Sequence, residues 1–209
     1  IRPRFDFGYS PTRHAGGLAE GELGGLVFRG DCRMADRLAS YGDRLSLLTL
    51  DKPLRASGKV ALRRGVSDST TLLGFYHSKD SLEVNPSQSS GWPRCFLGVV
   101  VEGPSREGFF LYPAYRGRES AQGNAGGADR SHILPDGKSH DWSLEYDPDG
   151  AHGRGRIVVK LDGKPVSLNL GAGHRKGGAG LDRFGLIPTW IDGNGQRVYF
   201  DDLTYTCEQ

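Results

Sequence analysis

The residue types needed to abstract a proton from an acidic sugar occur on three separate runs of the chain. His77 follows Tyr76, Arg63 lies in a basic pair, and Tyr112 lies in an aromatic run. Tyr and His can act as base and acid in β-elimination, and a cation can neutralise the sugar carboxylate. If Arg63, His77 and Tyr112 share one sheet face, they form a cationic and aromatic cleft. The alternative is that the tyrosines pack inside the protein and the arginines are solvated.

A second group of residues is suited to binding a sugar without chemistry. Sugars stack their apolar faces on exposed rings, while flanking polar groups bind the hydroxyls. Trp92 lies in the polar segment 87–94, and Trp190 lies next to a predicted turn. The further candidates are Arg94, Tyr115 and Arg116. Trp142 alternates with Leu144 in a regular strand pattern, and we therefore expect it in the core.

Short β-type runs separated by turn signals must position these residues. No stretch shows apolar residues at convincing helical spacing, and nine strands of this kind need two sheets. Hairpin turns are predicted between residues 102 and 108, 161 and 165, and 191 and 196. The fold class expected is all-β, a two-sheet antiparallel β-sandwich. The clearest strands are residues 59–64, 71–78, 95–102, 108–115, 140–147, 156–162, 166–170, 183–191 and 197–206.

Two segments do not read as strands. Residues 31–42 are weakly amphipathic and fit either a short helix or a loop. Residues 117–131 are polar and rich in glycine, which indicates a mobile surface loop. Such loops rim the binding face in sandwich enzymes and lectins, although a loop without any role is the equal alternative.

Length and charge limit the function classes. A chain of 209 residues fits one β-sandwich domain over 1–209 and can bury a core without disulfides or a structural metal. The 27 basic and 25 acidic residues give a net charge of +2 with no basic stripe, which argues against nucleic acid as a partner. No apolar run approaches the 18 or so residues of a membrane span, so no membrane insertion is expected.

Cysteine usage and the first residue give weaker indications. Cys32, Cys95 and Cys207 have no CxxC spacing, which argues against a zinc site. One disulfide with a remaining thiol and three buried thiols both fit. A chain that begins at Ile1 rather than Met suggests a piece of a longer precursor, with further domains.

Residues 135–170 and 181–206 resemble the second half of concanavalin A-like lectin/glucanase domains, including laminin-G-like ones. The resemblance rests on a strand with an aromatic residue, a strand ending in LDG, a short strand and a closing VYFDDL strand. It implies a jelly-roll sandwich with a concave sheet that commonly receives carbohydrate. Residues 5–30 have the general look of uncharacterised secreted bacterial proteins, which implies a secreted, periplasmic or cell-surface location.

The resemblance also bears on catalysis and on calcium. Glucanases of this superfamily carry an E-x-D-x-x-E strand, which this chain lacks, and Glu20 and Glu22 lie two apart among glycines. Related jelly rolls often hold a structural Ca²⁺ through an Asp of the final strand. Asp201 matches that position, and Glu22 is a candidate N-terminal partner.

Three functions follow from these patterns. We expect a carbohydrate-binding or accessory module of a secreted bacterial protein, with a polysaccharide or oligosaccharide as partner. The first alternative is a polysaccharide lyase or glycoside hydrolase acting on an acidic or neutral polysaccharide. The second is a structural or adhesion module with a protein partner.

Overall fold

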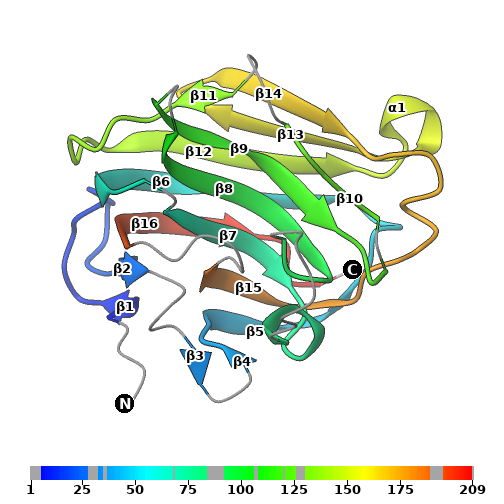
Figure 1. The fold of residues 1–209 in the computed structure, drawn as a ribbon, viewed down its shortest axis with the longest axis horizontal. Helices are drawn as coiled ribbons and strands as arrows, with labels where there is room; N and C mark the ends of the chain where they lie inside the picture. Colours follow the sequence, from blue (N-terminus) through cyan, green and yellow to red (C-terminus); the bar gives the residue numbers. More distant parts are fainter. Residues whose placement is uncertain are drawn as a thin grey trace.

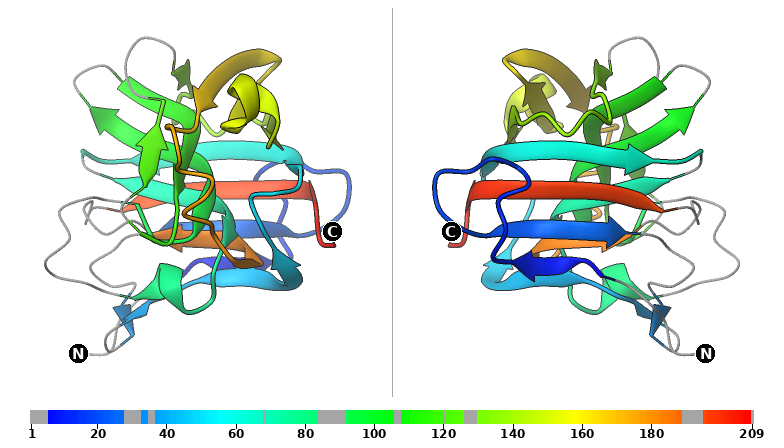
Figure 2. Two further views of the ribbon diagram at one scale, coloured as in Figure 1. Left: turned by 90° about the vertical axis from the view of Figure 1, so that its right-hand side faces the viewer. Right: turned by 90° about the vertical axis from the view of Figure 1, so that its left-hand side faces the viewer.

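The computed structural model describes residues 6–27, 33–34, 37–67, 69–83, 92–105, 108–119, 121–125, 130–188 and 195–208. These residues form two large antiparallel sheets, packed face to face as a sandwich (Figures 1 and 2). The all-β prediction is therefore confirmed. No helix in this described part is long and apolar enough to cross a membrane.

Sheet 1 contains seven strands, and its register follows the hairpins and long-range pairs of the chain. Neighbouring strands pair in the order β1, β2, β16, β6, β12, β13, β14. Their bounds are β1 Gly8–Ser10, β2 Glu22–Val27, β16 Gln196–Tyr205, β6 Leu54–Gly65, β12 His140–Asp147, β13 Arg156–Leu161 and β14 Lys164–Asn169.

Sheet 2 lies against sheet 1 and carries the most apolar strands. Its order is β10, β9, β8, β7, β15, β5, and β11 also pairs with β9. The bounds are β10 Gln122–Asn124, β9 Gly108–Arg116, β8 Phe96–Ser105, β7 Thr70–Tyr76, β15 Leu181–Pro188, β5 Tyr41–Leu48 and β11 Ser131–His132. The remaining elements are the pair β3 (Arg33–Met34) and β4 (Arg37–Leu38), the turn η1 (Asp80–Leu82) and the turn α1 (Gly150–Gly153).

The main core lies between the two sheets. Alternate residues of β12, Trp142, Leu144 and Tyr146, point into it and are buried, as the alternation predicts. Trp142 is only 3% exposed and packs edge-on against Phe200, with ring centroids 6.1 Å apart. The expectation that Trp142 is a core residue is therefore confirmed.

Sheet 2 is apolar on its outer face as well. A second cluster of buried residues covers this face and includes Leu72, Val100 and Tyr112. The runs of β8 and β9 are apolar at nearly every position, which is typical of strands buried on both faces. The outer face of sheet 2 is thus packed by side chains instead of being an open polar surface.

Glycines make room for large rings on that outer face. Gly98, Gly74, Gly185 and Gly42 are paired in register across four neighbouring strands. A Cβ on Gly98 would lie 2.6 Å from the Phe96 ring, and one on Gly42 would lie 2.8 Å from the Tyr76 hydroxyl. The absence of side chains here makes room for these two rings.

All nine predicted strands exist, but three local predictions need correction. Residues 191–196 do not join a hairpin, because β15 lies in sheet 2 and β16 in sheet 1. Within the described part of 31–42 there is no helix, since β3, β4 and the start of β5 occupy it. Residues 117–131 contain β10 and begin β11, so part of the predicted loop is sheet.

Candidate functional site

The outer face of β9 carries an ordered row of side chains. Phe110, Tyr112, Ala114 and Arg116 alternate along the strand, and all four are buried. We call these four residues the β9 row. Trp92 packs edge-on against Tyr112, with ring centroids 6.4 Å apart. The row therefore joins aromatic surface to a cation within one strand.

Arg130 closes one end of the β9 row. Its guanidinium carbon lies 4.4 Å from the ring centroid of Phe110 and 5.6 Å from that of Tyr112. Its Nη1 also donates to the Glu102 carboxylate at 2.9 Å. A cation held over aromatic faces is attracted by their quadrupoles, so Arg130 is fixed in orientation by both contacts.

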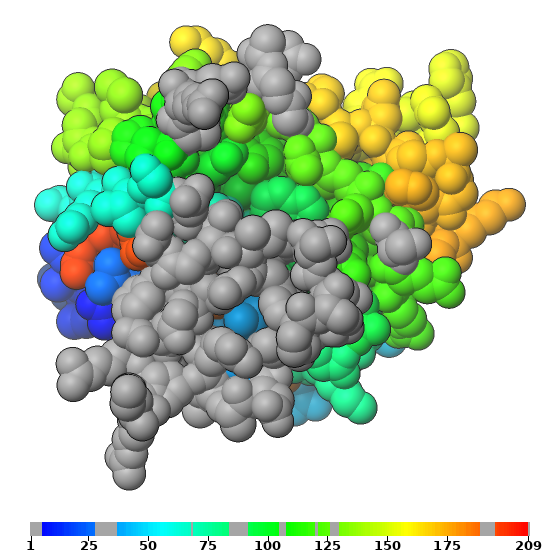
Figure 3. All heavy atoms as spheres, viewed as in Figure 1, coloured from blue at the N-terminus to red at the C-terminus, as the bar shows by residue number. Residues whose placement is uncertain are grey.

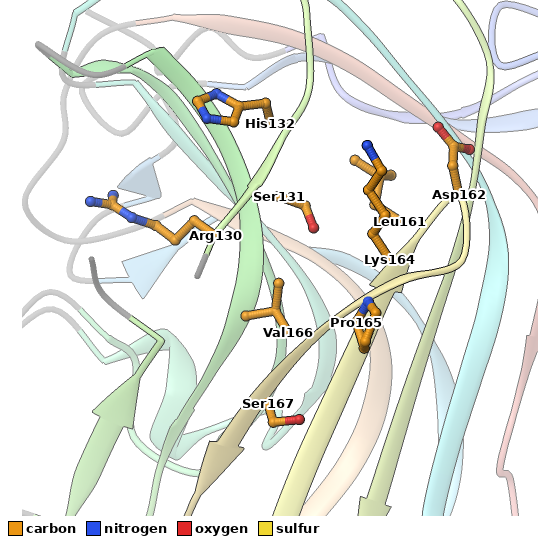
Figure 4. A pocket seen from close by; sticks show the side chains of 9 residues that line it. All are labelled: Arg130, Ser131, His132, Leu161, Asp162, Lys164, Pro165, Val166 and Ser167. Carbon is orange, nitrogen blue, oxygen red and sulfur yellow. The ribbon is translucent and has the colours of Figure 1, made fainter. Parts of the chain in front are cut away.

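A cavity of about 500 Å³ opens beside Arg130, at the sandwich edge between β11 and the β13–β14 hairpin (Figure 4). We call it the edge cavity. Ser131 points toward the hairpin, whereas Arg130 points away from it, toward β9. The lining residues are Arg130, Ser131, His132, Leu161, Asp162, Lys164, Pro165, Val166 and Ser167. The cavity thus combines cations, hydroxyl groups and an imidazole.

The charges around the edge cavity are unevenly paired. Asp162 accepts hydrogen bonds from His140 Nδ1 at 2.7 Å and from the Asp141 N–H at 3.0 Å. Burial opposes ionisation, but these bonds lower the pKa of Asp162 below its usual value. Lys164 has no ion pair with any described residue. Lys164 lies near enough to Asp162 to help lower the pKa of that carboxyl, but the Asp162 oxygens bind His140 and the Asp141 N–H. The cavity therefore presents the Lys164 amine without an ion pair to a described residue.

The predicted catalytic trio does not meet in one cleft. Arg63 is exposed on β6 of sheet 1, whereas Tyr112 lies on the outer face of sheet 2. His77 follows the last residue of β7, and its Nδ1 accepts the Asp80 N–H at 3.1 Å. The condition that these three residues share one sheet face is therefore not met, because the long-range topology puts Arg63 in the other sheet.

Three of the predicted sugar-binding residues do come together. The Arg116 Nη1 donates to the Trp92 carbonyl at 2.7 Å. Burial lowers the pKa of Arg116, and the nearby charge of Arg94 lowers it further. Arg94 itself forms an ion pair with Glu83. These residues lie at the end of the β9 row opposite Arg130.

The remaining two sugar-binding predictions have different outcomes. Tyr115 faces the core between the sheets, not the outer face, and its hydroxyl contacts His174 Nδ1 at 2.7 Å and accepts the Gly171 N–H at 3.0 Å. Burial raises the pKa of Tyr115, and the Gly171 hydrogen bond acts against it. Tyr115 therefore packs in the core, and the prediction that it lies on a binding surface needs correction. Trp190 lies outside the described residues.

The two predicted calcium ligands have donors of their own. Asp201 accepts the Gly17 N–H at 3.1 Å and the Asp202 N–H at 2.8 Å. Glu22 accepts hydrogen bonds from the Thr12 hydroxyl and the His14 N–H. Backbone N–H groups face oxygens of both carboxylates, and an N–H cannot serve as a Ca²⁺ ligand. Among the described residues no three His, Cys, Asp or Glu side chains gather around a metal position, and calcium stays a prediction.

The sequence reasoning missed Arg130, His132, Lys164 and Asp162. Arg130 and Ser131 fell in the segment 117–131, which was expected to be a mobile loop, His132 follows it directly, and 161–165 were regarded only as a turn. The available signal was the spacing of Arg130 and His132, which lie two apart and share a face when extended.

The space-filling view shows atoms of the β9–β10 region at the surface, beside residues 171–180 (Figure 3).

Comparison with solved structures supports the sandwich. A variant of the family 7 alginate lyase A1-II′ in complex with product superposes with a TM-score of 0.54 at 8% identity, covering 90% of this chain and 80% of that chain. A second variant of this lyase gives a TM-score of 0.50 at 9% identity, with the same coverage. The carbohydrate recognition domain of Emp47p gives 0.49 at 10% identity, covering 96% of this chain and 88% of that chain.

By sequence, no family model and no curated protein matches this chain. The likeness to the lyase is therefore one of fold. It agrees with the resemblance seen in residues 135–170 and 181–206. The chain has the two-sheet jelly-roll sandwich of the concanavalin A-like domains.

Proposed function

We propose that this chain is a carbohydrate-binding domain whose edge cavity takes an acidic saccharide. The observation that carries the proposal is the Lys164 amine, which has no ion pair among the described residues and borders a polar cavity of about 500 Å³. Binding sites for small ligands are concave and hold a few placed polar groups. Ser131 and Ser167 supply hydroxyls beside that cation.

The fold supports a saccharide as the ligand class. Two solved structures that share it, with TM-scores of 0.54 and 0.50, are of an alginate lyase, one of them in complex with product. A polysaccharide partner would be met outside the cytoplasm. The proposal therefore includes a secreted, periplasmic or cell-surface location.

The test is calorimetry with a uronate oligosaccharide and with its carboxyl-reduced, neutral form. We expect the acidic form to bind and Lys164→Met to weaken it about 10-fold, because one charge-assisted contact is lost. Lys52→Met is the matched control, since it removes the same charge from an exposed turn between β5 and β6. Equal binding of acidic and reduced forms would refute an acidic saccharide.

Polysaccharide-lyase action is the second candidate, and one arrangement favours it. Arg130 lies over Tyr112, and the His132 ring contacts Phe110 with centroids 4.7 Å apart. A cation, a phenol and an imidazole are the groups that β-elimination needs. Ultraviolet absorbance of unsaturated product would establish a lyase, and retention without product would establish a binding domain. Neither signal on any glycan would favour the adhesion alternative.

A further inference from the structure

Arg116 is a buried cation without a counterion among the described residues. The side chain ends the β9 row and is only 4% exposed. Its hydrogen bond goes from Nη1 to a neutral group, the Trp92 carbonyl, at 2.7 Å. The Nε is buried and has no partner, and no described carboxylate forms an ion pair with this guanidinium. Buried charges are usually paired, since desolvation of an unpaired ion is costly.

The surroundings make the positive potential at Arg116 stronger. Arg94 lies near enough to oppose the charge on Arg116, and Glu83 pairs with Arg94 instead of Arg116. A guanidinium carries five N–H donors in a planar fork. Within the described part of the chain, Nη1 donates to the Trp92 carbonyl and the buried Nε has no acceptor. An oxyanion is the ligand that such a fork accepts with two parallel hydrogen bonds.

Gln122 supplies a second unpartnered group at the same place. It is paired in register with Arg116 on the neighbouring strand β10, so the two side chains share a face. Its Oε1 is buried and has no hydrogen-bond partner in the part of the chain that the structure describes. The O and N of a glutamine amide can exchange places, and the exchanged amide would direct an N–H donor to a ligand.

We propose that Arg116 and Gln122 form an oxyanion-binding site at the end of the β9 row opposite Arg130, with Trp92 and Arg94 at its rim. The anion would be a second carboxylate of the same acidic saccharide that binds in the edge cavity. In this respect the oxyanion site rests on the proposed function. His132, which lines the edge cavity, is paired in register with Phe110, and Arg116 lies six residues further along β9, about 20 Å in an extended strand. Only a saccharide of several units could reach both this site and the edge cavity.

The test compares two ligand lengths. Calorimetry measures a uronate monosaccharide and a uronate hexasaccharide on the wild type, on Arg116→Met and on Arg118→Met. Arg118 is the matched control because it lies two residues away, carries the same charge, is 63% exposed in its side chain and contacts Asp80. We expect Arg116→Met to weaken the hexasaccharide about 10- to 100-fold and leave the monosaccharide unchanged. An unchanged hexasaccharide affinity overturns the proposal.

Inorganic sulfate separates this site from the saccharide site. Sulfate is expected to raise the Tm of the wild type and of Arg118→Met, but not of Arg116→Met. A sulfate effect that needs Arg116, with no saccharide bound, would keep the oxyanion site and refute the proposed function. The opposite outcome is saccharide binding that needs Lys164 but not Arg116, together with a sulfate effect that persists in Arg116→Met. It would refute the oxyanion site and keep the proposed function.

A conservative variant guards against a failure to fold. Arg116→Lys keeps the charge but cannot present a planar fork, because an ammonium is a point charge. We expect the sulfate-induced rise in Tm and the hexasaccharide affinity to lie below those of the wild type. Values equal to the wild type in both measurements would contradict the bidentate site.

Discussion

The guanidinium of Arg130 lies 4.4 Å from the centre of the Phe110 ring while it also holds the Glu102 carboxylate. The side chains of Arg130 and Glu102 are 14% and 25% exposed, so this ion pair is largely shielded from water. Glu102 therefore competes with any acidic ligand for the same guanidinium. The β9 row thus has a neutralised cation at the Arg130 end, whereas Arg116 has no ion pair with the residues that the structure describes.

Glu102→Gln should strengthen the binding of an acidic saccharide about 3- to 10-fold, because it removes the competing carboxylate. The same change should lower the free energy of unfolding by about 1 to 3 kcal/mol, since a shielded cation loses its partner. Calorimetry and thermal unfolding measure the two effects. Glu145→Gln is the control, because its pair with Arg55 is exposed and should matter little for either quantity. Weaker binding in Glu102→Gln would exclude Arg130 from the site.

Tyr115→Phe should reduce stability without changing saccharide binding. The hydroxyl accepts the Gly171 N–H and contacts His174, and its loss should cost about 1 kcal/mol. For a chain of this length that corresponds to a fall in Tm of about 2 to 4 °C. Thermal unfolding and calorimetry give both quantities. A large loss of affinity at unchanged Tm would return Tyr115 to the binding surface.

The different positions of Tyr112 and Tyr115 show where prediction from sequence stops. Alternation places these two tyrosines on opposite faces of β9. The run 108–115 is apolar at nearly every position, so no hydrophilic face indicates which side is inner. The β12 run alternates cleanly, and its inner residues, Trp142 among them, were predicted correctly. One-sided burial can be read from sequence, and two-sided burial cannot.

Sheet membership posed a different problem. Arg63 lies on β6 and His77 directly follows β7, and these strands are close in the chain, yet they belong to different sheets. The same holds for β15 and β16, where a glycine-rich turn signal suggested a hairpin. Local turn chemistry does not reveal whether a chain crosses between sheets. The convergence of Arg130, Lys164 and the β9 row depends on such long-range pairing.

Gly74→Ala should destabilise the protein by about 1 to 3 kcal/mol or more. A Cβ at this position would lie 2.5 Å from Gly98 Cα and from the Leu97 carbonyl oxygen, both of them backbone atoms in a packed sheet. Chemical denaturation measures the change. Gly177→Ala is the control, because its nearest neighbour would be the His174 carbonyl oxygen at 3.4 Å. Equal stability of the two variants would contradict the close approach of β7 and β8.

Asp201→Asn should loosen the N-terminal segment from sheet 1. One carboxylate oxygen accepts the Gly17 N–H and the other the Asp202 N–H, and an amide can accept at only one of these positions. We expect a loss of about 1 to 3 kcal/mol in stability and faster proteolysis near residues 17–18. Added calcium should leave the Tm of the wild type unchanged. A calcium-dependent rise that Asp201→Asn abolishes would instead establish the predicted metal site.

Asp162→Asn should remove part of the acid sensitivity of the protein. The pKa of Asp162 is lower in the folded protein than its ordinary value of 3.8, against the effect of burial, because His140 and the Asp141 N–H bind the ionised carboxylate. A lowered pKa means that the folded state binds this proton less tightly than the unfolded state. The stabilisation is therefore complete above pH 3.8 and is lost as the pH falls through the folded value.

Thermal unfolding of the wild type and of Asp162→Asn across acid and neutral pH measures this contribution. We expect the wild type to have the higher Tm near neutral pH and the two curves to converge below pH 3.8. Asparagine tolerates the left-handed backbone of position 162, where φ is +49°, so the difference reports the carboxylate. Asp141→Asn is the control, because Asp141 pairs with Lys59 on the exposed face of sheet 1. A difference in Tm that stays constant at all pH values would show that ionisation of Asp162 contributes nothing to the stability of the protein.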